Sequence, residues 1–139
     1  MKPIRIMAAS GMLGYGFTEE AFYNGLTLGL DLIACDAGSA DPGPYYLGSG
    51  TAFVSRLAAK RDLGLMVKGG MQENVPVFIG SAGGSGSNAQ VDWTLSILKE
   101  ICEEQNITPR IAVLRSEIDK ETLKSKIDNN RTALEDYTI

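Results

Sequence analysis

The segment LDLIACDAGSADPGPYYLGSG, residues 30–50, decides the fold of this chain. Its first part, residues 30–35, is a short and nearly uninterrupted apolar run, which is typical of a strand covered on both faces. Its second part, residues 36–50, carries two prolines and four glycines, the residues that turns favour. The segment therefore predicts a buried strand that opens into a long loop, which we call the middle loop.

Two further apolar runs end in glycine-rich loops of the same kind. Residues 4–9 lead into the first loop, residues 10–17, and the run VPVFIG, residues 75–80, leads into the third loop, residues 80–88. A helix-like stretch follows each loop, so the chain alternates strand, loop and helix. In a parallel sheet the three loops emerge at one edge, and open α/β sheets bind their ligands at that edge.

Amphipathic helices are expected after each loop. The first, residues 18–28, begins with Thr18 as a good N-cap, continues with two carboxylates, and ends at Gly29. The second is expected to begin near residues 50–51 and to end at residues 69–70, both glycine. The third covers residues 89–105, where apolar side chains recur at helical spacing.

The last part of the chain is charged and has no glycine after Gly86. Residues 110–114 are expected to form a fourth strand, and residues 119–129 a polar helix capped by Asn129 and Asn130. The sequence therefore predicts one α/β domain over residues 1–139. We expect a three-layer αβα arrangement, Rossmann-like or flavodoxin-like, with an open parallel sheet of four or more strands.

Composition restricts the class of protein. The chain has 139 residues, 44% of them hydrophobic and 22% charged, which is typical of a soluble globular domain. We see no apolar run long enough to cross a bilayer, and the first ten residues do not read as a secretory signal, so a cytoplasmic location is expected. A net charge of −4 argues against nucleic acid as a partner.

The chain contains no histidine, and its two cysteines lack metal-ligand spacing. It therefore cannot supply a Ser-His-Asp or Cys-His relay or a histidine base by itself. Chemistry must come from carboxylates, hydroxyls, thiols, lysine, backbone amides or the residues of a partner. Cys35 and Cys102 are expected to be free thiols rather than a disulfide.

The third loop, GSAGGSGSN, is the strongest local candidate for ligand binding. Four glycines and three serines in nine residues let a backbone approach a ligand, and amides at a helix start favour an anion such as a phosphate, a carboxylate or a CoA pyrophosphate. The alternative is that the glycines only permit a tight turn, with Ser87 or Asn88 as the N-cap. The candidate ligand-binding residues are Gly83, Gly84, Ser85, Gly86 and Asn88.

The middle loop contains two carboxylates, Asp36 and Asp41, which are the catalytic candidates. They suit a general acid/base pair, and Asp36, at the end of a strand, also suits a divalent metal. The alternative is that both carboxylates cap turns. Gly38, Ser39 and Tyr45 of the same loop are candidates for ligand contact, although a stacked aromatic role suits Tyr45 equally.

The first loop contributes Ser10 and Gly11 as ligand-binding candidates. Its glycines give GxxGxG, reversed from the usual dinucleotide fingerprint, which is a weak signal. Arg56 lies near the start of the helix after the middle loop, where a guanidinium reaches an anion at the sheet edge. Arg56 and Asp62 are expected on the charged, solvated face of that helix.

Several of these segments resemble the amino-terminal part of the acyclic terpene utilisation (AtuA) family. The matching segments are GMLGYGF (11–17), LIACDAGSADPGPYYLGSG (32–50), SRLAAKRDL (55–63) and IGSAGGSGSNAQVDWTLSILKEI (79–101). The string DAGSADPGPYYLGSG is far more specific than a glycine count. The resemblance covers most of residues 4–114.

The resemblance implies a place in the bacterial breakdown of acyclic terpenes and branched acids through CoA thioesters. It favours an enzyme component acting on a carboxylic acid or acyl-CoA, such as a hydratase or lyase. The alternatives are a non-catalytic module that binds phosphate or a nucleotide, and a structural subunit. Family members are longer, so we expect a partner domain, a partner subunit or self-association to complete the site.

Overall fold

The structure, a computed structural model, describes residues 3–128 and has a mixed α/β fold built on a parallel sheet. The three strands lie in the order β1-β2-β3, and Ile33 on the middle strand pairs with Met7 on one side and Val77 on the other. All three predicted strands of residues 4–80 are confirmed, each shorter than expected. They are β1 (Ile6–Ala8), β2 (Leu32–Asp36) and β3 (Val77–Gly80).

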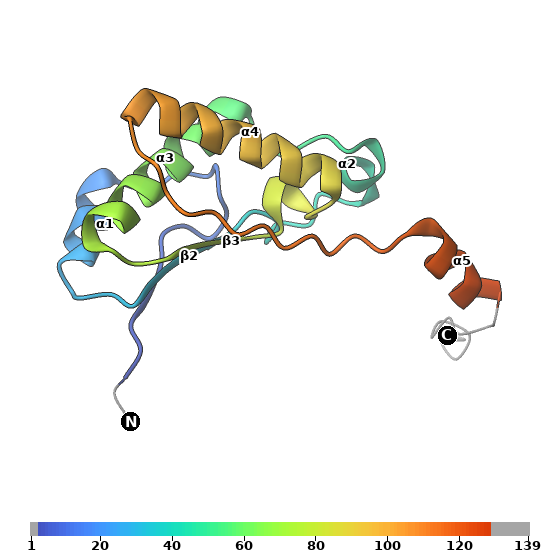
Figure 1. Ribbon diagram of the computed structural model, residues 1–139, viewed down its shortest axis with the longest axis horizontal. Helices are drawn as coiled ribbons and strands as arrows, with labels where there is room; N and C mark the ends of the chain where they lie inside the picture. Colours follow the sequence, from blue (N-terminus) through green and yellow to red (C-terminus); the bar gives the residue numbers. More distant parts are fainter. Residues whose placement is uncertain (1–2, 129–139) are drawn as a thin grey trace.

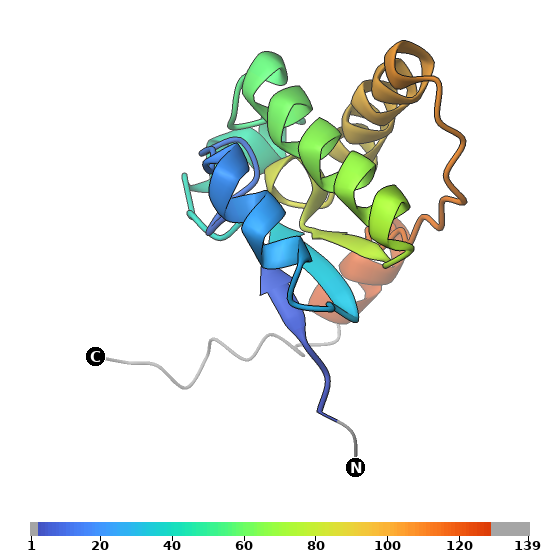
Figure 2. The ribbon, with the colours of Figure 1, turned by 90° about the vertical axis from the view of Figure 1, so that its left-hand side faces the viewer.

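Helices α1, α3 and α4 pack on the same face of this sheet (Figures 1 and 2). Right-handed crossovers that add each parallel strand on the same side of the last one place their connecting helices on one face. The helices are α1 (Glu19–Leu26), α2 (Pro44–Ser49), α3 (Arg56–Glu73), α4 (Asn88–Gln105) and α5 (Lys120–Asp128), with a short 3₁₀ turn, η1 (Ala82–Gly84), before α4.

The two faces of the sheet differ in burial. Ile33 on the helical face is fully buried in the core with Met66 of α3 and Ile97 of α4. On the opposite face Ile6 is 59% exposed and Phe78 is 62% exposed. Within residues 3–128 the sheet therefore has one packed face and one open apolar face.

The prediction for the start of the second helix was wrong. The middle loop contains α2, which has Pro44 in its first turn, and α3 begins only at Arg56. A proline is tolerated at a helix start because the amide it lacks has no helical partner there. Ser55 then caps α3, since its Oγ accepts a hydrogen bond from Ala58 N.

The expected end of this helix at residues 69–70 was also wrong, because α3 continues to Glu73. A Cβ atom at Gly69 would lie 2.7 Å from Phe22 Cε1, and one at Gly70 would lie 2.5 Å from Val77 Cγ2. These glycines therefore serve close packing of α3 on α1 and on β3 rather than helix termination.

The predicted fourth strand does not form in the described part of the chain. Residues 107–119 have no regular structure, and residues 110–114 are exposed, with Leu114 at 87%, so the predicted strand has neither ladder hydrogen bonds nor burial to hold it. It leads to α5, which lies at the far end of the molecule (Figure 1). The predicted caps, Asn129 and Asn130, lie outside the described residues.

The other helix predictions are close. Thr18 caps α1 as expected, its Oγ1 accepting from Ala21 N, and α4 begins one residue before the predicted start. Cys35 and Cys102 are free, as predicted. None of the helices in residues 3–128 is long and apolar enough to cross a membrane.

Burial predicts the reactivity of Cys35. Desolvation in the core raises the pKa of this thiol to about 11. Because the thiolate is the nucleophile, we expect iodoacetamide at pH 8 to label Cys35 slowly in the folded chain and rapidly in urea. Folding favours the protonated thiol of Cys35. The free energy of unfolding should therefore be constant below the ordinary thiol pKa and should fall as the pH rises towards 11. Peptide mass spectrometry measures the labelling, and fast modification of the folded chain would contradict this burial.

Candidate functional site

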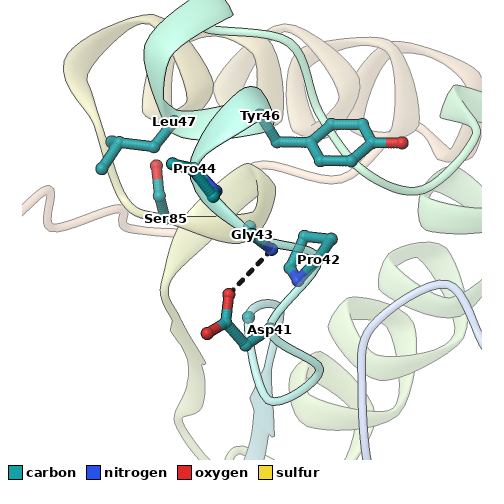
Figure 3. A pocket seen from close by; sticks show the side chains of 9 residues that line it. Asp41, Pro42, Gly43, Pro44, Tyr46, Leu47 and Ser85 are labelled. Carbon is teal, nitrogen blue, oxygen red and sulfur yellow. Dashed lines mark hydrogen bonds between the residues drawn. The ribbon is translucent and has the colours of Figure 1, made fainter.

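The middle and third loops lie against each other at the carboxyl edge of the sheet. A Cβ atom at Gly38 would lie only 2.2 Å from Gly84 O, so the two backbones approach as closely as a glycine permits. A pocket of about 390 Å³ opens between these loops (Figure 3). It is lined by Gly38, Asp41, Pro42, Gly43, Pro44, Tyr46, Leu47, Gly84 and Ser85.

Gln90, which is fully buried, joins the two walls of this pocket. Its Oε1 accepts hydrogen bonds from the backbone N, at 2.7 Å, and the Oγ of Ser85. Its Nε2 donates to Thr51 O at 2.7 Å and to Tyr46 O at 3.2 Å. The side chain on α4 therefore fixes the third loop relative to the middle loop.

Sequence reasoning missed Gln90. The apolar spacing that predicted α4 used Val91, Leu95, Leu98 and Ile101 or Cys102, of which Val91 and Ile101 are buried and the others only partly buried. The buried face of α4 includes Gln90, Thr94 and Ile97, which are also spaced as one helical face. A glutamine among the positions of that helical face was the signal in the sequence that could have identified Gln90.

The first loop is held by a buried carboxylate. Asp62 of α3 is fully buried, and its Oδ2 accepts from Gly14 N at 2.8 Å and from Gly16 N at 3.0 Å. Arg61 Nε donates to its Oδ1 at 2.8 Å. The prediction that Asp62 lies on a solvated face was wrong, and the two glycine amides that a phosphate would use already bind this carboxylate.

The two candidate carboxylates both form turns. Asp36 Oδ1 accepts from Gly38 N at 3.1 Å, and Asp41 Oδ1 accepts from Gly43 N at 2.9 Å. Only Asp41 lines the pocket (Figure 3). The two aspartates therefore differ in their surroundings. Asp41 forms a turn and also presents its carboxylate to a ligand, whereas Asp36 supports the middle loop beside the pocket.

The described residues offer little for a metal ion. In residues 3–128 no three or more Asp, Glu or Cys side chains come together in a group able to hold one. Asp36 supplies one carboxylate, so a divalent cation there would need further oxygen ligands from water or from a bound ligand.

The remaining candidates of the first two loops mostly support the loops themselves. Ser39 Oγ donates to Gly11 O, and Ser10 Oγ donates to Met12 O at 2.9 Å. Tyr45 is outside the pocket lining and packs edge-on against Tyr46. Of these contacts, the Ser39–Gly11 hydrogen bond ties the first loop to the middle loop, and the others lie within one loop.

Arg56 lies on the surface between α3 and α4, outside the pocket lining. Its guanidinium donates to Ser96 Oγ at 2.9 Å and pairs with Glu100, which Lys60 also contacts at 3.2 Å. The two cations hold the pKa of Glu100 below its ordinary value. Arg56 thus links two helices instead of facing the pocket.

The third loop satisfies much of its own backbone. Gly84 N donates to Ser81 O at 2.8 Å and Gly86 N to Ala82 O at 3.2 Å. Gly83 packs against Gln90. Of the four ligand-binding candidates at residues 83–86, Gly84 and Ser85 line the pocket, whereas Gly83 and Gly86 do not.

A carboxylate of the chain occupies the start of α4. Asn88 N donates to Glu117 Oε2 at 2.6 Å, and Arg115 contacts Asn88 Oδ1 at 3.2 Å while pairing with Asp92. The amide at which an anion was expected thus already binds an acidic group, as the positive end of a helix favours. An external anion at Asn88 must displace Glu117.

Comparisons of the chain with protein-family models, with curated proteins and with solved structures found no match.

Replacing Gln90 by methionine tests its role as the link between the loops. The substitution keeps the side-chain length but leaves Ser85 N and the Thr51 and Tyr46 carbonyls without a partner, so we expect a loss of about 3 kcal/mol in unfolding free energy. Urea denaturation measures it. Gln72→Met, at an exposed position of α3, is the matched control, and equal effects of the two changes would contradict the role.

Replacing Gly38 by alanine tests the contact between the loop backbones. Because its Cβ would meet Gly84 O, the loops must move apart, and we expect a loss of about 2 kcal/mol in unfolding free energy. Gly48→Ala in α2 is the control, since a Cβ there meets nothing within 4 Å. Thermal and urea unfolding compare the two variants, and a Gly38→Ala chain as stable as its control would refute the close approach.

Proposed function

We propose that this chain is an enzyme component of acyclic terpene or branched-acid catabolism. It acts on a carboxylic acid or acyl-CoA thioester, by hydratase or lyase chemistry. The observation that carries the proposal is the pocket between the middle and third loops, where Asp41 and Ser85 face a space also lined by Pro42, Pro44 and Leu47. A largely apolar pocket with a few polar groups at a sheet edge is the usual form of a small-molecule site.

Asp41 is the proposed acid/base residue. Hydration and its reverse each require a proton to be moved between water or a hydroxyl and a carbon beside a carbonyl, and a positioned carboxylate can carry that proton. The hydrogen bond from Gly43 N holds Asp41 Oδ1, which leaves Oδ2 to face the ligand. Asp36, which binds Gly38 N, positions the same loop.

The carboxylate of an acid, or the phosphates of CoA, require an anion site, for which Asn88 N is the proposed location. That amide binds Glu117 Oε2 in the structure, so an acidic ligand group replaces one carboxylate with another. Replacement keeps the hydrogen bond and the favourable helix dipole while releasing Glu117 from the start of α4.

We also propose that this protein is cytoplasmic. A partner is proposed to cover the open face of its sheet and to complete the site. Parallel sheets are nearly always covered on both faces, whereas Ile6 and Phe78 are exposed here. A second copy or a further domain on that face would give the three-layer arrangement, with a sheet of four or more strands. This open face favours one alternative function, that of a structural subunit in a larger assembly.

Replacing Asp41 by asparagine tests the enzymatic proposal. The asparagine Oδ1 still accepts from Gly43 N, so folding should be unchanged, while loss of the acid/base group should lower turnover by about 100-fold or more. The assay follows hydration of crotonyl-CoA and 3-methylcrotonyl-CoA by the full chain. Glu73→Gln, an exposed change at the end of α3, is the control.

The outcomes separate the two functions. Full turnover in Asp41→Asn would remove Asp41 from the chemistry, and the same substitution at Asp36 then tests the other carboxylate. If the unaltered chain turns over neither thioester and no CoA compound raises its melting temperature, the structural-subunit function is favoured.

A further inference from the structure

We infer that the pocket recognises a hydrogen-bond donor on its ligand, namely the hydroxyl group of a branched aliphatic acid or acyl thioester. The inference rests on the proposed function and names its substrate class. It comes from the direction of each hydrogen bond around the pocket. Those directions leave the polar side chains of Asp41 and Ser85 as hydrogen-bond acceptors towards this space.

The direction of the Ser85 hydrogen bond follows from its neighbours. Gln90 Nε2 lies 2.7 Å from Thr51 O and 3.2 Å from Tyr46 O, and because both are carbonyls, the nitrogen must be the donor. Gln90 Oε1 therefore faces Ser85 and accepts from both its backbone N and its Oγ. A hydroxyl has a single hydrogen, and Ser85 Oγ also accepts from Ser87 N at 3.4 Å, so it offers the pocket only its remaining lone pair.

Asp41 has the same polarity. Its Oδ1 accepts from Gly43 N at 2.9 Å, and an ionised carboxylate has no hydrogen to donate. The exposed Asp41 retains Oδ2 as an acceptor for a ligand, since its only hydrogen bond among the described residues is to Gly43. A phosphate or a bare carboxylate placed here would meet a like charge without a donor from this side chain.

The backbone of the lining supplies few donors. Four of its amides donate to other protein atoms, and its two prolines have no N–H. Figure 3 shows the Tyr46 side chain directed away from Asp41 and Ser85, so its phenol is not a donor in this space either. The four amides belong to Gly38, Gly43, Gly84 and Ser85.

The rest of the lining determines what carries the donor. Pro42, Pro44 and Leu47 present apolar surface, and about 390 Å³ accommodates a small branched aliphatic group. An ammonium would also donate, but the acids and thioesters of the proposed function carry no amine. A hydroxyl between Asp41 and Ser85, with its alkyl part on the prolines, donates its single hydrogen to one of these two acceptors.

Ligands matched in shape test this inference on the full chain. Calorimetry compares 3-hydroxy-3-methylbutyrate with 3-methylbutyrate, which lacks only the hydroxyl, and with 3-amino-3-methylbutyrate. We expect the hydroxy acid to bind about tenfold more tightly than the deoxy acid, the gain typical of a hydrogen bond to a charged partner. 2-Methyl-2-butanol, which keeps the hydroxyl and lacks the acid, is the fourth probe.

The probes distinguish this inference from the proposed function. Equal binding of the hydroxy and deoxy acids, tighter binding of the amine, or no binding of either hydroxyl compound would overturn the inference. If 2-methyl-2-butanol binds but neither acid does, hydroxyl recognition stands and the function on acids falls. If the deoxy acid binds as well as the hydroxy acid, the function stands and hydroxyl recognition falls.

Two variants assign the preference to its residues. Ser85→Ala removes one acceptor and should reduce the preference about threefold or more, whereas Ser87→Ala, which removes a buried Oγ that has no partner in residues 3–128, should keep it. Asp41→Asn turns an Nδ2 donor towards the ligand, so it should favour 3-oxobutyrate over 3-hydroxybutyrate. Unchanged ligand preferences in both Ser85→Ala and Asp41→Asn would place the hydroxyl contact elsewhere.

Discussion

The buried amide of Gln90 is the interaction on which the pocket depends. It satisfies the Ser85 backbone N on one loop and the Thr51 and Tyr46 carbonyls on the other, so the two walls keep one separation. If the two loops moved apart, the buried Gln90 amide would lose its hydrogen bonds to both loops, which is costly at that depth. The loops therefore keep all of these hydrogen bonds or lose them together. Asp62 has the same role for the first loop, where it binds the amides of Gly14 and Gly16.

The glycine-rich loops serve packing more than anion binding. Gly38 permits the approach of Gly84 O, Gly83 lies against Gln90, and the amides of Gly84 and Gly86 bind carbonyls of their own loop. Side chains of the protein, those of Asp62 and Glu117, occupy the positions where a phosphate would be held. The polar side chains that remain in the pocket are acceptors, so the proposed ligand donates a hydrogen bond there, while its acid group is proposed to bind at Asn88 N.

The same topology that gathers the loops leaves the sheet half covered. Adding strands in the order β1-β2-β3 with right-handed crossovers puts the connecting helices α1 and α3 on one face, and α4 packs on the same face (Figures 1 and 2). Ile6 and Phe78 on the other face are apolar and exposed, and residues 107–119 have no regular structure next to this sheet. A surface of this kind is typical of a contact with another chain or domain.

Short-range patterns by themselves determined much of the fold and part of the site. The apolar runs predicted three strands, Thr18 predicted the start of α1, and the aspartates of the middle loop predicted the turns that Asp36 and Asp41 form. These features depend on residues only two or three positions apart, so a short window of the sequence contains every residue that determines them. The order of strand, loop and helix then brought the candidate residues to one edge of a parallel sheet.

Tertiary structure alone decided which of those residues face a ligand. Gln90 binds carbonyls 39 and 44 positions away, and Asp62 binds amides 46 and 48 positions away. Gly69 and Gly70 resemble a helix end in sequence, yet contact with Phe22 and Val77 keeps them inside α3. Local spacing has no information about such partners, because the direction of a buried hydrogen bond is set by whichever distant backbone groups folding brings beside it.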